Sequence, residues 1–146
     1  MLRVVLDTNQ LVSALLNPEG TAFEILKTSG LKGDRKYELT ISDEILSEFK
    51  RVLFYPRIQK LHNWSQEKID LFIALLKENS HRDKSLSREK IVLEDPDDDK
   101  FFHLALKTGA QYIVSRDKHL LRIKEFEGVK VLKPEVFLDA LRRQVL

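Results

Sequence analysis

The most acidic part of the chain is the stretch DPDDDKFFHLAL at residues 95–106, where four aspartates fall within five positions. Carboxylates this close together repel one another, so their clustering needs a physical reason. One reason is helix capping, because an acid in a first helical turn gains typically ~0.3–1 kcal/mol from the helix dipole. Asp95 and Asp97 fit this explanation, with Asp95 as the cap residue and Pro96 at the first helical position. The other reason is a cation held by oxygen ligands.

Asp98 differs from its neighbours in its position on the predicted helix. Phe101, Phe102 and Ala105 follow it at i+3, i+4 and i+7, which places Asp98 on the buried face of that helix. Asp99 shares only part of this apolar stripe. The alternative for Asp98 is a capping arrangement with Asp95, and the periodicity does not exclude it.

Glu48, in the stretch SDEILSEFKRVL, raises the same question. It lies three residues after Ile45 and four before Val52, so it falls on the apolar stripe of its predicted helix. A carboxylate facing a core is costly unless it is paired or bound to a cation. A single glutamate at the edge of a core is more often paired with a lysine, and that interpretation stays open for Glu48.

Asp7 and Asp117 each follow a predicted strand, in LDTN and VSRD. In a parallel sheet both carboxylates lie at the same edge. A single aspartate after a strand is usually a turn residue. Four acids with one common destination instead predict a site for Mg²⁺ or Mn²⁺, which prefer oxygen ligands and can activate water for phosphodiester cleavage. Zinc is disfavoured, because the chain has no cysteine and its four histidines form no H-x₃-H pair.

The elements that position these acids alternate along the chain. Strands are predicted at residues 2–6, 37–41, 111–115 and 129–132, with a further short strand at 90–93. Helices are predicted after Asp7, over 22–28, from Ser42 to a break at Pro56, from Ser65, from Pro96 to about Thr108, and from Pro134. Residues 77–90 are predicted to be a polar surface connection. This alternation indicates an α/β fold with a mostly parallel sheet.

The composition is that of an ordinary globular protein. With 146 residues, 42% hydrophobic and 33% charged, the chain is expected to form one domain over residues 1–146. The absence of cysteine excludes disulfides. No signal-peptide pattern and no apolar run of about 18 residues is visible, so we expect a cytoplasmic protein with no membrane segment. The net charge of +2 permits a nucleic-acid partner without indicating one.

Four segments in order resemble the PIN-domain family of nucleases, and more narrowly its VapC-like toxin ribonucleases from prokaryotic toxin–antitoxin systems. These segments are VVLDTNQLVSALL, SDEILSEFKRVL, DPDDDKFFHLALKTGAQYIVSRDKHLL and VKVLKPEVFL. The resemblance implies an acidic quartet of catalytic metal ligands at Asp7, Glu48, Asp98 and Asp117. Counting back from Asp117 puts the third acid at Asp99, whereas aligning the helix through Ala105 puts it at Asp98, which the helical face also favours. Asn9 and Ser115 are implied to support the ligands or bound water.

The resemblance also implies a fold and an activity. The fold is a PIN-like three-layer α/β/α sandwich with a mostly parallel central sheet. The implied activity is Mg²⁺- or Mn²⁺-dependent endonucleolytic cleavage of single-stranded RNA by water, and the implied partners are a second copy in a homodimer and a cognate antitoxin. Arg116, Lys118 and His119 flank Asp117 and could bind RNA phosphates, although each could equally be an ordinary solvated side chain.

Two other classes of protein fit the sequence less well. A phosphatase or phosphotransferase with Asp7 as covalent nucleophile would need a second acid, as in D-x-D-x-[TV], and the chain has DTNQL there. A receiver domain fails on the same ground. A catalytically silent PIN domain that acts as an RNA- or protein-binding module remains as the alternative.

Overall fold

The computed structural model describes residues 1–31, 33–83 and 99–146, and its centre is a six-stranded sheet. The strand order is β3-β2-β1-β4-β6-β5, and all neighbours are parallel except β5 and β6. The strands are β1 (Arg3–Leu6), β2 (Glu38–Ser42), β3 (Ser80–Asp83), β4 (Tyr112–Val114), β5 (Glu125–Phe126) and β6 (Val129–Leu132).

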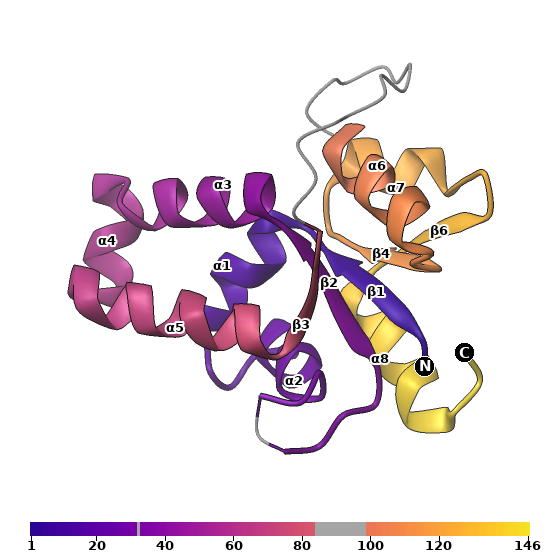
Figure 1. Ribbon diagram of the computed structural model, residues 1–146, viewed down its shortest axis with the longest axis horizontal. Helices are drawn as coiled ribbons and strands as arrows, with labels where there is room; N and C mark the ends of the chain where they lie inside the picture. The colour runs from indigo at the N-terminus through magenta and orange to yellow at the C-terminus, as the bar shows by residue number, and fades with distance from the viewer. Residues whose placement is uncertain (32, 84–98) are drawn as a thin grey trace.

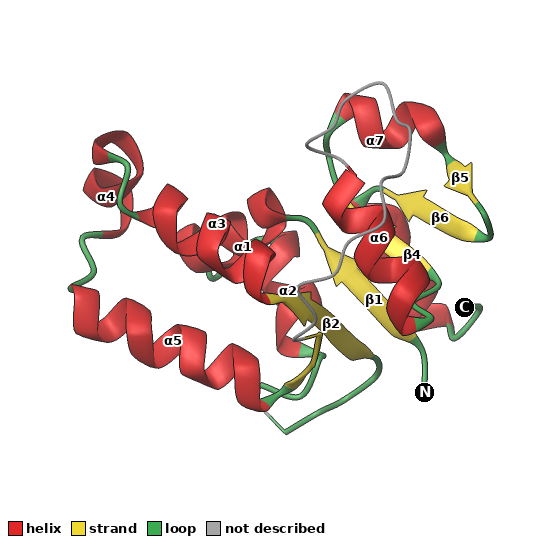
Figure 2. Cartoon of the chain, turned by 45° about the horizontal axis from the view of Figure 1, so that its top comes forward, coloured by secondary structure: helices red, strands yellow, loops and turns green. Residues whose placement is uncertain are grey.

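Helices cover both faces of this sheet (Figures 1 and 2). Helix α6 packs across β1, β2, β4 and β6 on one face, while α1, α2 and α8 pack together on the other, and α5 packs beside β3. The described helices are α1 (Thr8–Leu16), α2 (Thr21–Lys27), α3 (Asp43–Leu53), α4 (Pro56–His62), α5 (Gln66–Glu78), α6 (Asp99–Thr108), α7 (Lys118–Ile123) and α8 (Pro134–Arg143). The predicted three-layer α/β/α sandwich with a mostly parallel sheet is confirmed.

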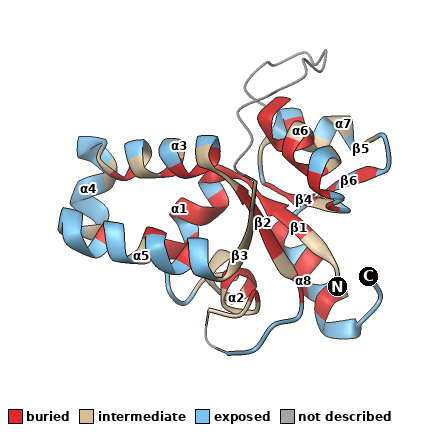
Figure 3. Cartoon of the chain, in the orientation of Figure 1, coloured by how far each residue is buried: buried red, intermediate tan, exposed pale blue. Residues whose placement is uncertain are grey.

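The core lies between the sheet and its two helical layers (Figure 3). Val4 and Val5 of β1 are completely buried, as expected for a central strand covered on both faces. From α6, Phe102 packs edge-to-face on Phe126 with ring centroids 5.7 Å apart. From α8, Phe137 packs edge-on against Tyr37 at 5.5 Å. Burying aromatic side chains of this size stabilises the fold by about 1.5–3 kcal/mol each.

Several local predictions are confirmed in atomic detail. The hydroxyl of Ser42 accepts a hydrogen bond from Ile45 N at 3.1 Å and so caps α3. Ser65 caps α5 in the same way. Pro134 occupies the first turn of α8, where a missing N–H costs nothing. Helix α6 ends at Thr108, and Gly109 follows in the left-handed region at φ 75°, as a glycine at this position allows.

Other predictions are corrected by the structure. The polar connection predicted over 77–90 contains β3, whose sequence SHRD carries no apolar alternation. Because β3 is an edge strand held by backbone pairing to β2, it needs no apolar side chains. Helix α3 ends at Leu53, and Pro56 begins the separate helix α4. The short elements α7 and β5 were not predicted, and the strand predicted at 90–93 lies outside the described residues.

No helix in the described part of the chain is long and apolar enough to cross a membrane.

Candidate functional site

The candidate site begins at Asp7, directly after the central strand β1. The chain runs from β1 outward to β2 and β3, and then returns to place β4 on the other side of β1. The carboxyl ends of β1 and β4 therefore meet at a topological switch point, where parallel sheets form their binding crevices. Asp7 is 3% exposed there, and its Oδ1 caps α1 by accepting a hydrogen bond from Gln10 N at 2.8 Å.

Ser115 joins Asp7 to the next strand. The pairing of Leu6 with Val114 puts the residues that follow them, Asp7 and Ser115, side by side. Ser115 is completely buried, and its hydroxyl donates a hydrogen bond to Oδ2 of Asp7. The Ser115 hydroxyl oxygen also accepts a hydrogen bond from Asp117 N at 2.9 Å. One hydroxyl thus holds both acidic segments in place.

Asp117 lies at the start of the unpredicted helix α7. Its Oδ1 accepts hydrogen bonds from His119 N at 2.8 Å and Leu120 N at 3.3 Å, so it is the cap residue of that helix. The capping bonds hold the half-buried carboxylate at the start of α7 rather than leaving it free in a loop. The interpretation of Asp117 as a turn residue and the interpretation as a site residue are therefore compatible.

Glu48 approaches the same cluster from α3, which follows β2. It is close enough that its charge, together with that of Asp117, acts on Asp7. Its carboxylate forms an ion pair with the ammonium of Lys100 on α6. Burial raises the pKa of Glu48, but the hydrogen bond and charge of Lys100, together with Thr8 and the charge of Arg51, outweigh this effect, and the pKa lies below its ordinary value. Pairing with a lysine was the alternative that the sequence left open for this residue.

The electrostatics of the site are dominated by the burial of Asp7. The pKa of Asp7 is raised from 3.8 to about 6, chiefly by burial. The neighbouring carboxylates of Asp117 and Glu48 contribute to this increase, while the hydrogen bonds from Ser115 and Gln10 oppose it. Ionised Asp7 is therefore unfavourable in the folded protein unless positive charge is supplied nearby.

The remaining predicted acids lie on or before α6. Asp99 begins α6 and is 5% exposed. Asp98, like Asp95 and Asp97, lies outside the described residues, so its place in the quartet stays a prediction. Asn9 is exposed on the first turn of α1, where the structure gives it no described contact with the cluster.

Lys100 is the site residue that sequence reasoning did not assign. It is 8% exposed, and its ammonium lies 5.1 Å from the ring centroid of Phe101 as well as against Glu48. The signal that could have found it was the core-facing position of Glu48, which requires a partner cation. The sequence could not show which of the many lysines would be that partner.

The carboxylates of the described residues are the right type of ligand for a hard divalent cation, but by themselves they do not form a complete coordination group. Carboxylate oxygens are the ligands that Mg²⁺ and Mn²⁺ prefer, and a cation would relieve the unfavourable ionisation of buried Asp7. Within residues 1–31, 33–83 and 99–146, no three His, Cys, Asp or Glu side chains are close enough together to hold one ion. Glu48 is instead engaged by Lys100.

The predicted RNA-binding residues surround Asp117 on its solvent side. Arg116, Lys118 and His119 are all exposed. The guanidinium of Arg116 pairs with Glu135 at the start of α8. Because both side chains of this pair are more than half exposed, a phosphate could displace Glu135 at little cost.

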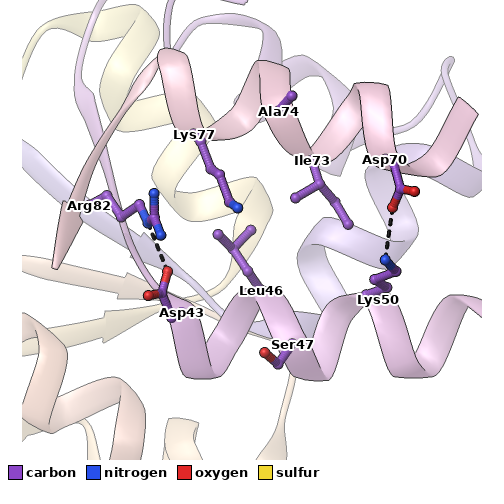
Figure 4. A pocket seen from close by; sticks show the side chains of 9 residues that line it. All are labelled: Asp43, Leu46, Ser47, Lys50, Asp70, Ile73, Ala74, Lys77 and Arg82. Carbon is purple, nitrogen blue, oxygen red and sulfur yellow. Dashed lines mark hydrogen bonds and ion pairs between the residues drawn. The ribbon is translucent and has the colours of Figure 1, made fainter. Parts of the chain in front are cut away.

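A pocket of about 590 Å³ lies apart from this cluster, between α3 and α5 (Figure 4). Its acids are already paired, Asp43 with Arg82 at 2.7 Å and Asp70 with Lys50 at 2.8 Å. Leu46 and Ile73 supply apolar surface between the two pairs. The pocket therefore offers no group of unneutralised carboxylates comparable to that around Asp7.

Open parallel α/β sheets form their ligand crevices at such a switch point, and carboxylates gathered there are the oxygen ligands that hard divalent cations prefer. Residues 3–119 match the family model of the PIN domain. The chain belongs to the PIN-domain family, whose members are in general nucleases that use divalent metals. A search of curated proteins gave no match.

Proposed function

We propose that the protein is a Mg²⁺- or Mn²⁺-dependent endoribonuclease that cleaves single-stranded RNA. The observation that supports this most directly is the buried Asp7, which shares its strand edge with Asp117 and Glu48 and whose pKa is raised to about 6. A fold does not usually concentrate carboxylates at the end of its central strand without a cation to neutralise them. Membership of a nuclease family supports the same conclusion.

In the proposed reaction, the metal ligands are Asp7, Glu48 and Asp117, with Asp98 or Asp99 as the fourth acid. A bound Mg²⁺ or Mn²⁺ supplies an activated water and stabilises negative charge on the phosphate. Ser115 keeps the carboxylate of Asp7 in one orientation through its hydroxyl hydrogen bond. The backbone bonds from Gln10, His119 and Leu120 fix the orientations of the Asp7 and Asp117 carboxylates, which would be two of the ligands.

The RNA strand is proposed to pass over the first turn of α7. Arg116, Lys118 and His119 present their side chains to solvent beside Asp117, so they can contact phosphates without contacting bases. Asn9 is exposed in the first turn of α1, where it could contact bound water or the RNA backbone.

As a VapC-like ribonuclease, the protein is proposed to be the toxin of a type II toxin–antitoxin pair. Its partners would then be a cognate antitoxin that blocks the acidic edge and a second copy of the chain in a homodimer. Both proposals rest on the family resemblance of the sequence. Co-expression with the product of a neighbouring open reading frame, followed by co-purification, would test the first. Sedimentation would test the second.

A second candidate is a PIN domain that binds RNA or a protein without cleaving. The observation that favours it is the ion pair between Glu48 and Lys100, which occupies one proposed ligand, together with the lack of a three-acid metal group in the described part of the chain. In this case the acidic edge would be a recognition surface.

The deciding experiment is cleavage of a 5′-labelled pool of single-stranded RNA with Mg²⁺, with Mn²⁺ and with EDTA. The wild type is compared with Asp7→Asn, Asp98→Asn and Asp99→Asn, and with Asp139→Asn as a control on the exposed face of α8. Metal-dependent cleavage that is lost in Asp7→Asn and in either Asp98→Asn or Asp99→Asn supports the nuclease and identifies the fourth acid. RNA binding without cleavage by any protein supports the binding module.

A further inference from the structure

The ammonium of Lys100 lies where a cation is expected. It forms an ion pair with Glu48, whose charge acts on buried Asp7. It comes from α6 on one face of the sheet and reaches across to α3, rather than pairing with an acid of its own helix. Its side chain is 9% exposed, whereas an ordinary surface lysine keeps its ammonium in water.

Burying an ammonium is costly, so its location needs an explanation. The effective penalty for removing such an ion from water is several kcal/mol unless strong partners replace the water. Glu48 is one such partner, and the face of the Phe101 ring at 5.1 Å is a second, weaker one. Arg51 also acts on Glu48, but from an exposed position on α3. Lys100 is thus the buried positive charge beside this carboxylate in the described part of the chain.

The same carboxylate cannot serve the lysine and a divalent ion fully at once. Short ion-pair contact with the ammonium uses an oxygen of Glu48, and two cations drawn to one carboxylate repel each other. The lysine stem is flexible, so the ammonium can leave Glu48 without a backbone movement and keep its contact with the ring of Phe101.

We propose that the ammonium of Lys100 takes the place of the metal at Glu48. It neutralises the acidic edge in the metal-free protein and competes with the divalent ion for Glu48. The inference rests on the metal site of the proposed function. Lys100 is a positioning residue that acts through Glu48. It sets how much free Mg²⁺ or Mn²⁺ the protein needs before the site fills.

A purely structural ion pair would behave differently. In that case loss of the lysine would lower stability and leave the affinity for metal unchanged. A substitute for the metal predicts lower stability without metal, tighter metal binding, and recovery of the lost stability when metal is added. Metal affinity therefore separates the two roles, independently of any RNA cleavage.

The test is Mn²⁺ binding to the full chain, measured by the loss of the free-ion electron paramagnetic resonance signal, together with thermal unfolding in EDTA and in Mn²⁺. The variants are Lys100→Met, which keeps the shape without the charge, and Lys100→Arg, which keeps the charge. Lys107→Met is the matched control, because Lys107 lies on the same helix and pairs with Asp83 at 3.7 Å. Lys100→Gln replaces the methionine variant if that variant does not fold.

We expect Lys100→Met to bind Mn²⁺ at least about tenfold more tightly than the wild type, which corresponds to about 1.4 kcal/mol. It should melt at a lower temperature in EDTA and show a larger increase in melting temperature with Mn²⁺. Lys100→Arg and Lys107→Met should bind Mn²⁺ with nearly the wild-type affinity. Equal or weaker Mn²⁺ binding by Lys100→Met overturns the inference while the metal site stands. Absence of Mn²⁺ binding from every protein, including the wild type, overturns the metal site and the inference together.

Discussion

Asp7→Asn is expected to stabilise the metal-free protein at neutral pH. The carboxylate of Asp7 is buried after β1, and its pKa is raised from 3.8 to about 6, chiefly by that burial. A group whose folded pKa is raised in this way costs stability once it is ionised. The cost is absent below about pH 3.8, where Asp7 is protonated in both states, grows as pH rises, and is complete above about pH 6.

The magnitude follows from the displacement of the pKa. A difference of about two pH units corresponds to about 3 kcal/mol between the folded and unfolded states. Asparagine removes this cost. However, it cannot accept the hydrogen bonds of both Gln10 N and the Ser115 hydroxyl in the way the carboxylate does, which forfeits about 1 kcal/mol. The expected gain is about 2 kcal/mol, or roughly 4–8 °C in melting temperature for a chain of this size.

The assay is urea and thermal unfolding in EDTA at pH 4.0 and pH 7.5. Asp7→Asn should be more stable than the wild type at pH 7.5, and this advantage should disappear at pH 4.0. Asp139→Asn, which changes an exposed acid paired with Arg143, should stay within about 0.5 kcal/mol of the wild type at both pH values. A wild type that is as stable as Asp7→Asn at pH 7.5 would show that Asp7 carries no unfavourable charge, and the electrostatic reasoning for a cation site would fail.

Three further predictions concern single side chains. Ser115→Ala should destabilise the protein by about 1–3 kcal/mol in urea unfolding, because it removes the hydroxyl partner of the buried Asp7 carboxylate, and it should weaken Mn²⁺ binding. Arg116→Ala should weaken binding of single-stranded RNA in a filter assay and reduce the slope of log affinity against log salt by about one, with no change in Mn²⁺ affinity; an unchanged salt slope would remove Arg116 from the RNA path. Tyr37→Phe should lower the free energy of unfolding by about 1 kcal/mol, because the completely buried residue loses the 2.7 Å hydrogen bond that its phenol donates to the Ile25 carbonyl in α2; full wild-type stability would contradict this.

The parts of the fold that could be predicted are those marked by short patterns of neighbouring residues. Apolar β-branched runs marked β1 and β4, and cap residues such as Ser42 and Ser65 marked where helices begin. These signals are encoded within a few residues, so they survive without knowledge of the tertiary structure. The edge strand β3 escaped prediction because backbone pairing with β2 stabilises it, and SHRD has no side-chain pattern that reveals this.

Some residues of the candidate site could likewise be predicted from the sequence, and others could not. Asp7 and Asp117 could be selected from the sequence, because each directly follows a strand and parallel strands bring such positions to one edge. The position of Glu48 on an apolar stripe indicated that it needs a positive partner, but not which one. Asp98, chosen from its helical face, lies outside the described residues and is left to the cleavage experiment.

By itself, the sequence determined the types of element, the order in which they occur, and the acids that follow the strands, because these depend on spacing and composition over short stretches. Only the tertiary structure decided that β4 lies beside β1, that the Ser115 hydroxyl joins Asp7 to Asp117, and that Lys100 reaches Glu48 from a helix 52 residues away in the chain. Contacts of this kind depend on how whole helices and strands pack and on which oppositely charged side chains are brought close enough to form an ion pair. No local pattern of residues encodes that choice.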